Sequence, residues 1–255
     1  MLSELIIYFT IYSFIGWLWE CLISIIRDHK VINRGFLNGP YCPIYGCGAL
    51  LFIALTKITN NPILIFFVGG LIACILEYIT SYLMEKIFKA RWWDYSNRKL
   101  NLNGRICFTG YIVFGIGAVT ILYLHPLLAQ EIQTIKAKDI IAIAIAAILI
   151  LDILSTNQSF TRLNKILRDY QKTLMKAPIA QFFEQQGKKF FGTVNNKRVR
   201  TFTWQQRRII KAFPSFQTNY DHAYQEMKKF YKSTKQKPIK SQKAHARKNA
   251  KKILK

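Results

Sequence analysis

Residues 62–84 read PILIFFVGGLIACILEYITSYLM, and Glu77 is the only acidic or basic side chain in this stretch. An α-helix rises about 1.5 Å per residue, so roughly 20 apolar residues cross the hydrocarbon core of a bilayer. The stretch is long enough and apolar enough to do so. It therefore predicts a transmembrane helix with a single carboxylate inside the membrane.

Other apolar stretches extend this pattern along the chain. Two are of similar length and two are shorter. The sequence thus predicts an all-α, polytopic membrane protein. Its five expected spans cover residues 2–26, 44–58, 62–84, 106–128 and 139–155. The alternative for residues 44–58 is a re-entrant helix, which would leave four spans.

Charge divides the chain into two parts. Residues 1–155 hold 12 Lys and Arg against 9 Asp and Glu, whereas residues 156–255 hold 25 against 4. Nearly all of the formal net charge of +24 therefore lies in the C-terminal part. This distribution is typical of a membrane domain followed by a basic cytoplasmic tail. We place the boundary at residue 155.

The loop charges also predict an orientation. Cytoplasmic loops carry an excess of Lys and Arg. The loop after the first expected span has three, the next has one, the third has six and the fourth has two, before the basic tail. This alternation favours a multi-pass protein of the plasma membrane with its N-terminus outside and its C-terminus in the cytoplasm.

Two similar short segments lie on the cytoplasmic side of this topology. Residues 37–42 read LNGPYC and residues 102–107 read LNGRIC. Each leads into an apolar stretch, so the chain can contain two parallel copies of one helix pair. The residues expected to shape these turns are Gly35, Gly39, Pro40, Pro43, Gly46 and Gly104. An apolar loop rich in Gly and Pro suits a re-entrant turn, although a tight interfacial turn remains the alternative.

Glu20 and Glu77 are the strongest functional candidates. Both lie about 9 to 11 Å inside the cytoplasmic boundary of their expected spans. An ionisable group at such a depth costs about 2.5 to 3.5 kcal/mol to insert, which favours a functional role. Arg34 and Arg105 are the expected partners, either in a structural ion pair or in a substrate or proton site. The further candidates for a cytoplasm-facing polar cavity are Asn38, Tyr41, Tyr45, Asp94 and Asn103.

Two other acids have simpler interpretations. Asp94 belongs to the run WWDYS at residues 92–96, whose aromatic side chains suit the membrane interface. Its carboxylate is expected to accept hydrogen bonds from the loop backbone or from Arg105. Asp152 lies near the inner end of the last expected span, where its position at a helix end explains its charge.

These motifs together resemble a known family. The run NRGFLNGPYCPIYG at residues 33–46, with Gly16, Trp17, Glu20, Glu77, WWDYS and NGRIC, looks like the bacterial family described as type IV ABC-transporter permeases. The resemblance covers residues 8–112, and the run RRIIKAFPSF at residues 207–216 is similar to that family's C-terminal region. It implies an integral membrane component of a transporter.

The motif inventory favours transport over catalysis. The sequence has no G-x-x-x-x-G-K-[ST] phosphate-binding loop, so any ATPase of this transporter would be a separate chain. We expect no cofactor and no metal, and we expect free thiols rather than disulfides for the five cysteines. The alternatives are a membrane-embedded enzyme or binding protein for a lipid or lipid-linked substrate, and a non-catalytic scaffold.

The C-terminal part suggests a partner of its own. Apolar residues recur at helical spacing between residues 163 and 174 among Lys and Arg, and roughly the last 20 residues are expected to be disordered. Basic amphipathic helices bind anionic membrane surfaces. Anionic lipid is therefore the expected partner of the tail, in preference to nucleic acid.

Overall fold

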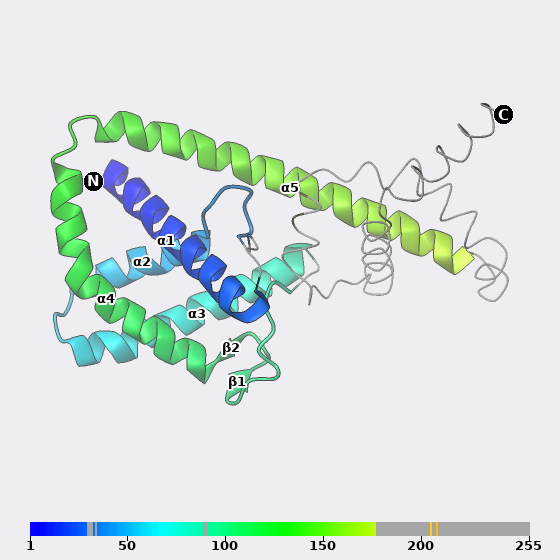
Figure 1. Cartoon of the computed structure of the whole chain (residues 1–255), viewed down its shortest axis with the longest axis horizontal. Coiled ribbons are helices and arrows are strands. Elements are labelled where there is room, and N and C mark those ends of the chain that lie inside the picture. The colour runs from blue at the N-terminus through cyan, green and yellow to red at the C-terminus, as the bar shows by residue number, and fades with distance from the viewer. Residues whose placement is uncertain (30–32, 34, 89–90, 177–204, 206–207, 209–255) are drawn as a thin grey trace, which may run out of the picture.

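The structure of the chain is a computed structural model that describes residues 1–29, 33, 35–88, 91–176, 205 and 208. Five helices dominate it, and two short strands join the third helix to the fourth (Figure 1). In chain order the elements are α1 (Leu2–Asp28), α2 (Pro43–Thr56), α3 (Pro62–Phe88), β1 (Asn101–Leu102), β2 (Ile106–Cys107), α4 (Phe108–Gln133) and α5 (Lys138–Lys176).

The expectation of a helical membrane protein is confirmed. Within the described residues, α1, α3, α4 and α5 are each long and apolar enough to cross a bilayer. The fifth helix, α2, has 14 residues. At 1.5 Å per residue it is about 21 Å long, which is shorter than the roughly 30 Å hydrocarbon core.

The helices extend beyond the apolar stretches that predicted them. Helix α3 continues to Phe88, α4 to Gln133, and α5 passes residue 155 and reaches Lys176. Apolar length reports the part of a helix that lipid can surround, whereas Lys, Glu, Gln and Arg continue a helix readily in water. The expected boundary of the tail therefore falls within a continuous helix.

The chain between α1 and α2 returns along α1. The backbone N–H of Cys42, which caps α2, donates to the Ser13 carbonyl at 2.9 Å. Ser13 lies 15 residues before the end of α1 at Asp28, which corresponds to about 22 Å along the helix axis. Helix α2 therefore begins beside the middle of α1. Residues 35–42 run back along α1, and we call them the re-entrant loop for this course.

Glycine allows close packing of α2 against α1 and of α4 against α3. A Cβ at Gly46 of α2 would lie 2.5 Å from the Phe9 carbonyl oxygen of α1, and a Cβ at Gly115 of α4 would lie 2.8 Å from that of Phe66 in α3. Only glycine permits this approach of backbones, as is usual in membrane bundles. Each of the pairs α1–α2 and α3–α4 thus contains a close backbone approach at a glycine.

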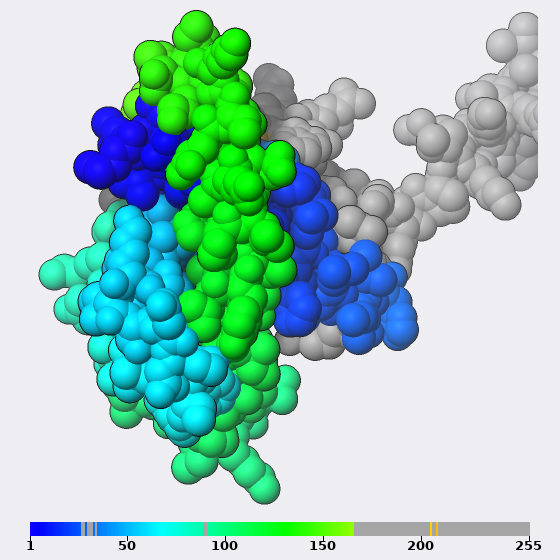
Figure 2. Space-filling view, turned by 90° about the vertical axis from the view of Figure 1, so that its left-hand side faces the viewer, coloured from blue at the N-terminus to red at the C-terminus, as the bar shows by residue number. Residues whose placement is uncertain are grey.

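The outer surface of the bundle is apolar. Large side chains such as Ile116 and Leu127 of α4 are more than half exposed. Figure 2 shows α4 (green) crossing this face beside the cyan region of α2 and α3. An apolar surface of this extent suits contact with lipid chains.

The short strands are a feature that the sequence did not predict. β1 pairs antiparallel with β2, with Asn101 opposite Cys107 and Leu102 opposite Ile106. Asn103 and Gly104 both have positive φ, at 54° and 66°, as in a type I′ turn. The run LNGRIC is therefore a hairpin, whereas the described residues of LNGPYC form no strand.

Candidate functional site

Glu77 lies in the interior of the bundle. Its residue surface is only 5% exposed, and its Oε1 accepts a hydrogen bond of 2.9 Å from the Tyr95 hydroxyl. Its Oε2 is buried and accepts no hydrogen bond from the residues that the structure describes. A buried carboxylate oxygen without a donor is costly, which marks Glu77 as an exception among buried polar groups.

Tyr95 reaches Glu77 from the loop between α3 and α4. The loop backbone fixes it, because the Tyr95 N–H donates to the Gly104 carbonyl at 2.8 Å. The pKa of Tyr95 is raised by burial, then by the charge of Glu77, and also by the charge of Glu20. Tyr95 is thus a neutral donor that lies within the influence of both acids.

Glu20 has a partner of the same kind. Its Oε1 accepts a hydrogen bond of 2.7 Å from the Tyr45 hydroxyl in the first turns of α2. The Tyr45 ring lies against Gly16 of α1, where a Cβ would come within 2.2 Å of its Cγ. Gly16 therefore makes room for the tyrosine that holds Glu20.

The two glutamate–tyrosine pairs lie in the same region of the bundle. The ring centroids of Tyr45 and Phe114 are 6.2 Å apart. A Cβ built on Gly110 would lie 3.9 Å from the Phe114 ring and 3.7 Å from Glu77 Oε2. Phe114 and Gly110 of α4 therefore connect one pair to the other. We call Glu20, Tyr45, Glu77, Tyr95, Gly110 and Phe114 the diacid site.

The sequence spacing accounts for the different origins of the two tyrosines. Glu20 and Glu77 are 57 residues apart, whereas the helix-capping Cys42 and Cys107 are 65 apart. The eight additional residues lie partly in the longer end of α3 and partly in the chain between α3 and α4, which includes Tyr95. Gly110 occupies the position that Tyr45 occupies in the first helix pair, so a loop tyrosine supplies the missing hydroxyl.

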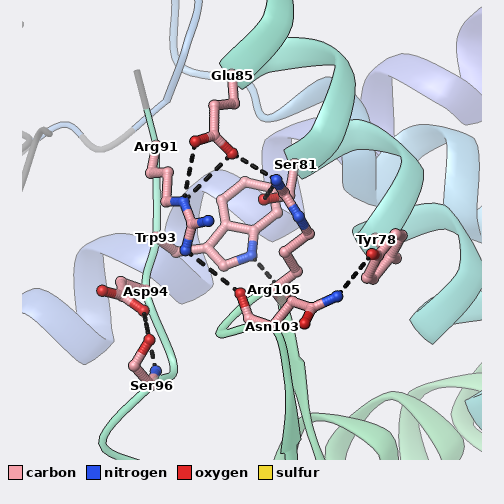
Figure 3. A network of polar contacts seen from close by, with 9 residues as sticks. All are labelled: Tyr78, Ser81, Glu85, Arg91, Trp93, Asp94, Ser96, Asn103 and Arg105. Carbon is pink, nitrogen blue, oxygen red and sulfur yellow. Dashed lines mark hydrogen bonds and ion pairs between the residues drawn. The ribbon is translucent and has the colours of Figure 1, made fainter. Parts of the chain in front are cut away.

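Arg105 does not pair with either acid of the diacid site. Its guanidinium donates to Ser81 Oγ at 3.1 Å and to the Glu85 carboxylate at 2.5 Å (Figure 3). Arg91 contacts the same carboxylate at 3.2 Å. The expectation that Arg105 partners Glu77 is therefore wrong, because Arg105 forms its ion pair with Glu85 near the end of α3. Arg34, the other expected partner, lies outside the described residues.

The loop residues around Arg105 stabilise one another. Asp94 Oδ1 accepts from the Ser96 hydroxyl at 2.5 Å and from its backbone N–H at 2.9 Å, and these bonds lower the pKa of Asp94. The Asn103 side chain donates to the Tyr78 hydroxyl at 3.0 Å (Figure 3). Asp94 accordingly bonds to the loop rather than to Arg105. Neither Asp94 nor Asn103 forms these hydrogen bonds with a residue of the diacid site.

Asp152 of α5 anchors the re-entrant loop. Its Oδ1 accepts from the Asn38 side chain at 2.7 Å, and its Oδ2 accepts from the Gly39 N–H at 2.8 Å and the Tyr41 hydroxyl at 2.6 Å. Sequence reasoning assigned Asp152 to a helix end and missed this role. An acid inside the apolar run 139–155 was the available signal. Asn38 and Tyr41 thus bind Asp152 and not the diacid site.

Two further residues of the runs quoted from the sequence, Trp17 and Asn33, contact the same part of the chain. The Asn33 side-chain oxygen accepts from Trp17 Nε1 of α1 and from the Gly35 N–H, both at 3.0 Å. Pro43 occupies the first turn of α2, where a missing N–H carries no penalty. Pro40, by contrast, is exposed at the surface of the loop.

One arginine of the C-terminal part reaches this loop. Arg208 is 7% exposed and donates to the carbonyls of Gly35 at 2.6 Å and Phe36 at 2.9 Å. Burial lowers its pKa. Gln205 donates to Ser155 of α5 at 2.8 Å. Apart from these residues and the end of α5, the expected basic tail and its lipid contacts lie outside the described residues.

Comparison with known proteins supports the family resemblance. Residues 7–157 match the protein family described as "Putative ABC-transporter type IV". The match covers more than half of the chain and includes every residue of the diacid site and Asp152. No curated protein and no solved structure matches the chain.

Proposed function

The chain belongs to this family of ABC-transporter-type membrane proteins, and from that premise we propose that it is the membrane-embedded subunit of a transporter. The diacid site is the proposed substrate pathway, and it opens toward the cytoplasm. The observation that carries the proposal is the buried Glu77 carboxylate, one oxygen of which has no hydrogen-bond donor among the described residues. A structural carboxylate is normally saturated, as Asp152 is.

The proposed orientation places the diacid site in the cytoplasmic half of the membrane. The excess of Lys and Arg in alternate loops and in the tail supports an outer N-terminus and a cytoplasmic C-terminus. The same charge supports binding of the tail to anionic lipid, with nucleic acid as the less favoured polyanion. Energy would come from a separate ATPase chain, because this sequence has no phosphate-binding loop.

Isolation of the intact complex tests this function. The full chain, purified from membranes of its own host in mild detergent, is expected to retain a protein with a G-x-x-x-x-G-K-[ST] motif and to hydrolyse ATP. Glu77→Gln preserves the shape of the side chain and removes its charge. It is expected to lower ATP turnover by about tenfold, equivalent to about 1.4 kcal/mol, at unchanged membrane abundance.

Glu131→Gln is the matched control, because Glu131 is an exposed acid of α4 that should not affect turnover. The proposal fails if no ATPase accompanies the chain. It also fails if Glu77→Gln lowers abundance without lowering turnover per complex, since the residue would then serve folding.

A further inference from the structure

Charge balance separates Glu77 from other acids of the bundle. Glu4 pairs with Lys138 at 2.6 Å, and Glu85 pairs with Arg91 and Arg105. No described Lys or Arg forms an ion pair with Glu77, and its Oε2 accepts no hydrogen bond within the same part of the chain. A buried carboxylate needs a compensating positive charge or a proton.

Aromatic side chains lie in the region of the Glu77 carboxylate. Tyr95 donates to Oε1 of Glu77, and a Cβ built at Gly110 would lie 3.7 Å from Oε2 and 3.9 Å from the Phe114 ring. The Tyr45 ring follows, at 6.2 Å from Phe114. Carboxylates combined with aromatic rings are the surroundings that bind organic ammonium groups, through ion pairing and cation–π attraction.

The donor set is less suited to a divalent metal. Calcium takes six to eight oxygen ligands, and zinc usually takes four ligands from Cys, His and carboxylates. Among the described residues, no three His, Cys, Asp or Glu side chains converge to hold an ion. The tyrosine hydroxyls donate their protons to the carboxylates, so they act here as donors.

We propose that the diacid site binds the ammonium group of a cationic ligand, with Glu77 Oε2 as its principal acceptor and Glu20 as the second charge. The substrate class inferred here rests on the proposed transport function. Gly110 of α4 lies beside this oxygen, since a Cβ built there would be 3.7 Å from Glu77 Oε2. The ammonium group can belong to a free amine or to an ethanolamine lipid headgroup.

Thermal unfolding of the purified full chain in detergent tests the site. The probe is methylammonium chloride, compared with sodium chloride at the same ionic strength and followed by tryptophan fluorescence. A ligand that binds only the folded state stabilises it in proportion to ln(1 + [L]/Kd). We expect a saturable rise in Tm with methylammonium that is absent in Glu77→Gln and unchanged in Glu131→Gln.

Tyr95→Phe keeps the Glu77 carboxylate and removes one donor, so it guards against a Glu77→Gln variant that fails to fold. We expect it to shift the methylammonium midpoint concentration and to retain saturation. The proposal is overturned if methylammonium and sodium act alike on the wild type. It is also overturned if methylammonium has no effect on the wild type and Glu77→Gln has a higher Tm than the wild type. Glu77 would then be a neutral, protonated group in the folded protein and would need no cation.

Nanodiscs with and without phosphatidylethanolamine distinguish the two sources of the ammonium group. A methylammonium effect that disappears only with phosphatidylethanolamine assigns the site to a headgroup, and one that persists assigns it to a free amine. These measurements need no ATPase. A protein that binds methylammonium but has no associated ATPase would retain this inference and refute the proposed function. The opposite pair of results would refute the inference alone.

Discussion

At the scale of single residues, each buried acid has a tyrosine hydroxyl as its hydrogen-bond donor. Gly16 accommodates the ring of Tyr45, which in turn holds Glu20. In the second helix pair, Gly110 stands where the first has Tyr45, and Tyr95 of the loop donates to Glu77 instead. Two identical carboxylate–hydroxyl contacts therefore arise from different local sequences.

Replacement of Gly16 tests this dependence. A Cβ at residue 16 would lie 2.2 Å from Tyr45 Cγ, so Gly16→Ala must displace the ring or separate α1 from α2. Overpacking of this kind costs about 1 to 3 kcal/mol. We expect a lower Tm in detergent for Gly16→Ala. Gly117→Ala is the control, since a Cβ at residue 117 would meet no described atom within 4 Å, and an unchanged Tm in both variants would contradict the packing of Tyr45.

At the scale of elements, the re-entrant loop is held from two sides. Asp152 of α5 accepts from Asn38, Gly39 and Tyr41, and Arg208 donates to the carbonyls of Gly35 and Phe36. These contacts join residues that are more than 100 positions apart in the chain. They place α2, and with it Tyr45, beside the middle of α1.

Arg208→Ala should loosen this loop selectively. Its two bonds are charge-assisted and worth about 1.5 to 3 kcal/mol each, so their loss should raise the labelling rate of buried Cys42 by about tenfold or more. Cys107 provides an internal control, because it is similarly buried and caps α4. Maleimide labelling, quantified for each cysteine by mass spectrometry, measures both. Equal acceleration at Cys42 and Cys107, or none at Cys42, would refute the role of Arg208.

The sequence predicted elements better than contacts. Apolar length identified four helices that are long enough to cross a bilayer and the shorter helix α2, because hydrophobicity is a local property of a segment. It could not assign partners to Arg105, because Glu85 and Glu77 lie about two turns apart on the same helix and only the loop geometry selects between them. The role of Asp152 was hidden for the same reason, since all its loop donors come from a distant segment.

At the scale of the whole molecule, the acids, the re-entrant loop and the last helix belong to one arrangement. Helices α1 and α3 supply the carboxylates, α2 and the loop before α4 supply the hydroxyls, and α5 fixes the loop from outside (Figure 1). In the proposed orientation, the diacid site opens to the cytoplasm and carries negative charge. Access and charge can both be measured at one position.

Gly110→Cys is that position, because its Cβ would make ordinary contacts, 3.7 Å from Glu77 Oε2. The variant is prepared in a chain whose five native cysteines are replaced. Cationic and anionic methanethiosulfonates are applied from either side of sealed membrane vesicles, and their rates are normalised to a free thiol in solution. We predict labelling from the cytoplasmic side only, with the cationic reagent favoured by about tenfold or more. Labelling from the outer side, or equal rates for the two reagents, would contradict a negatively charged site that opens to the cytoplasm.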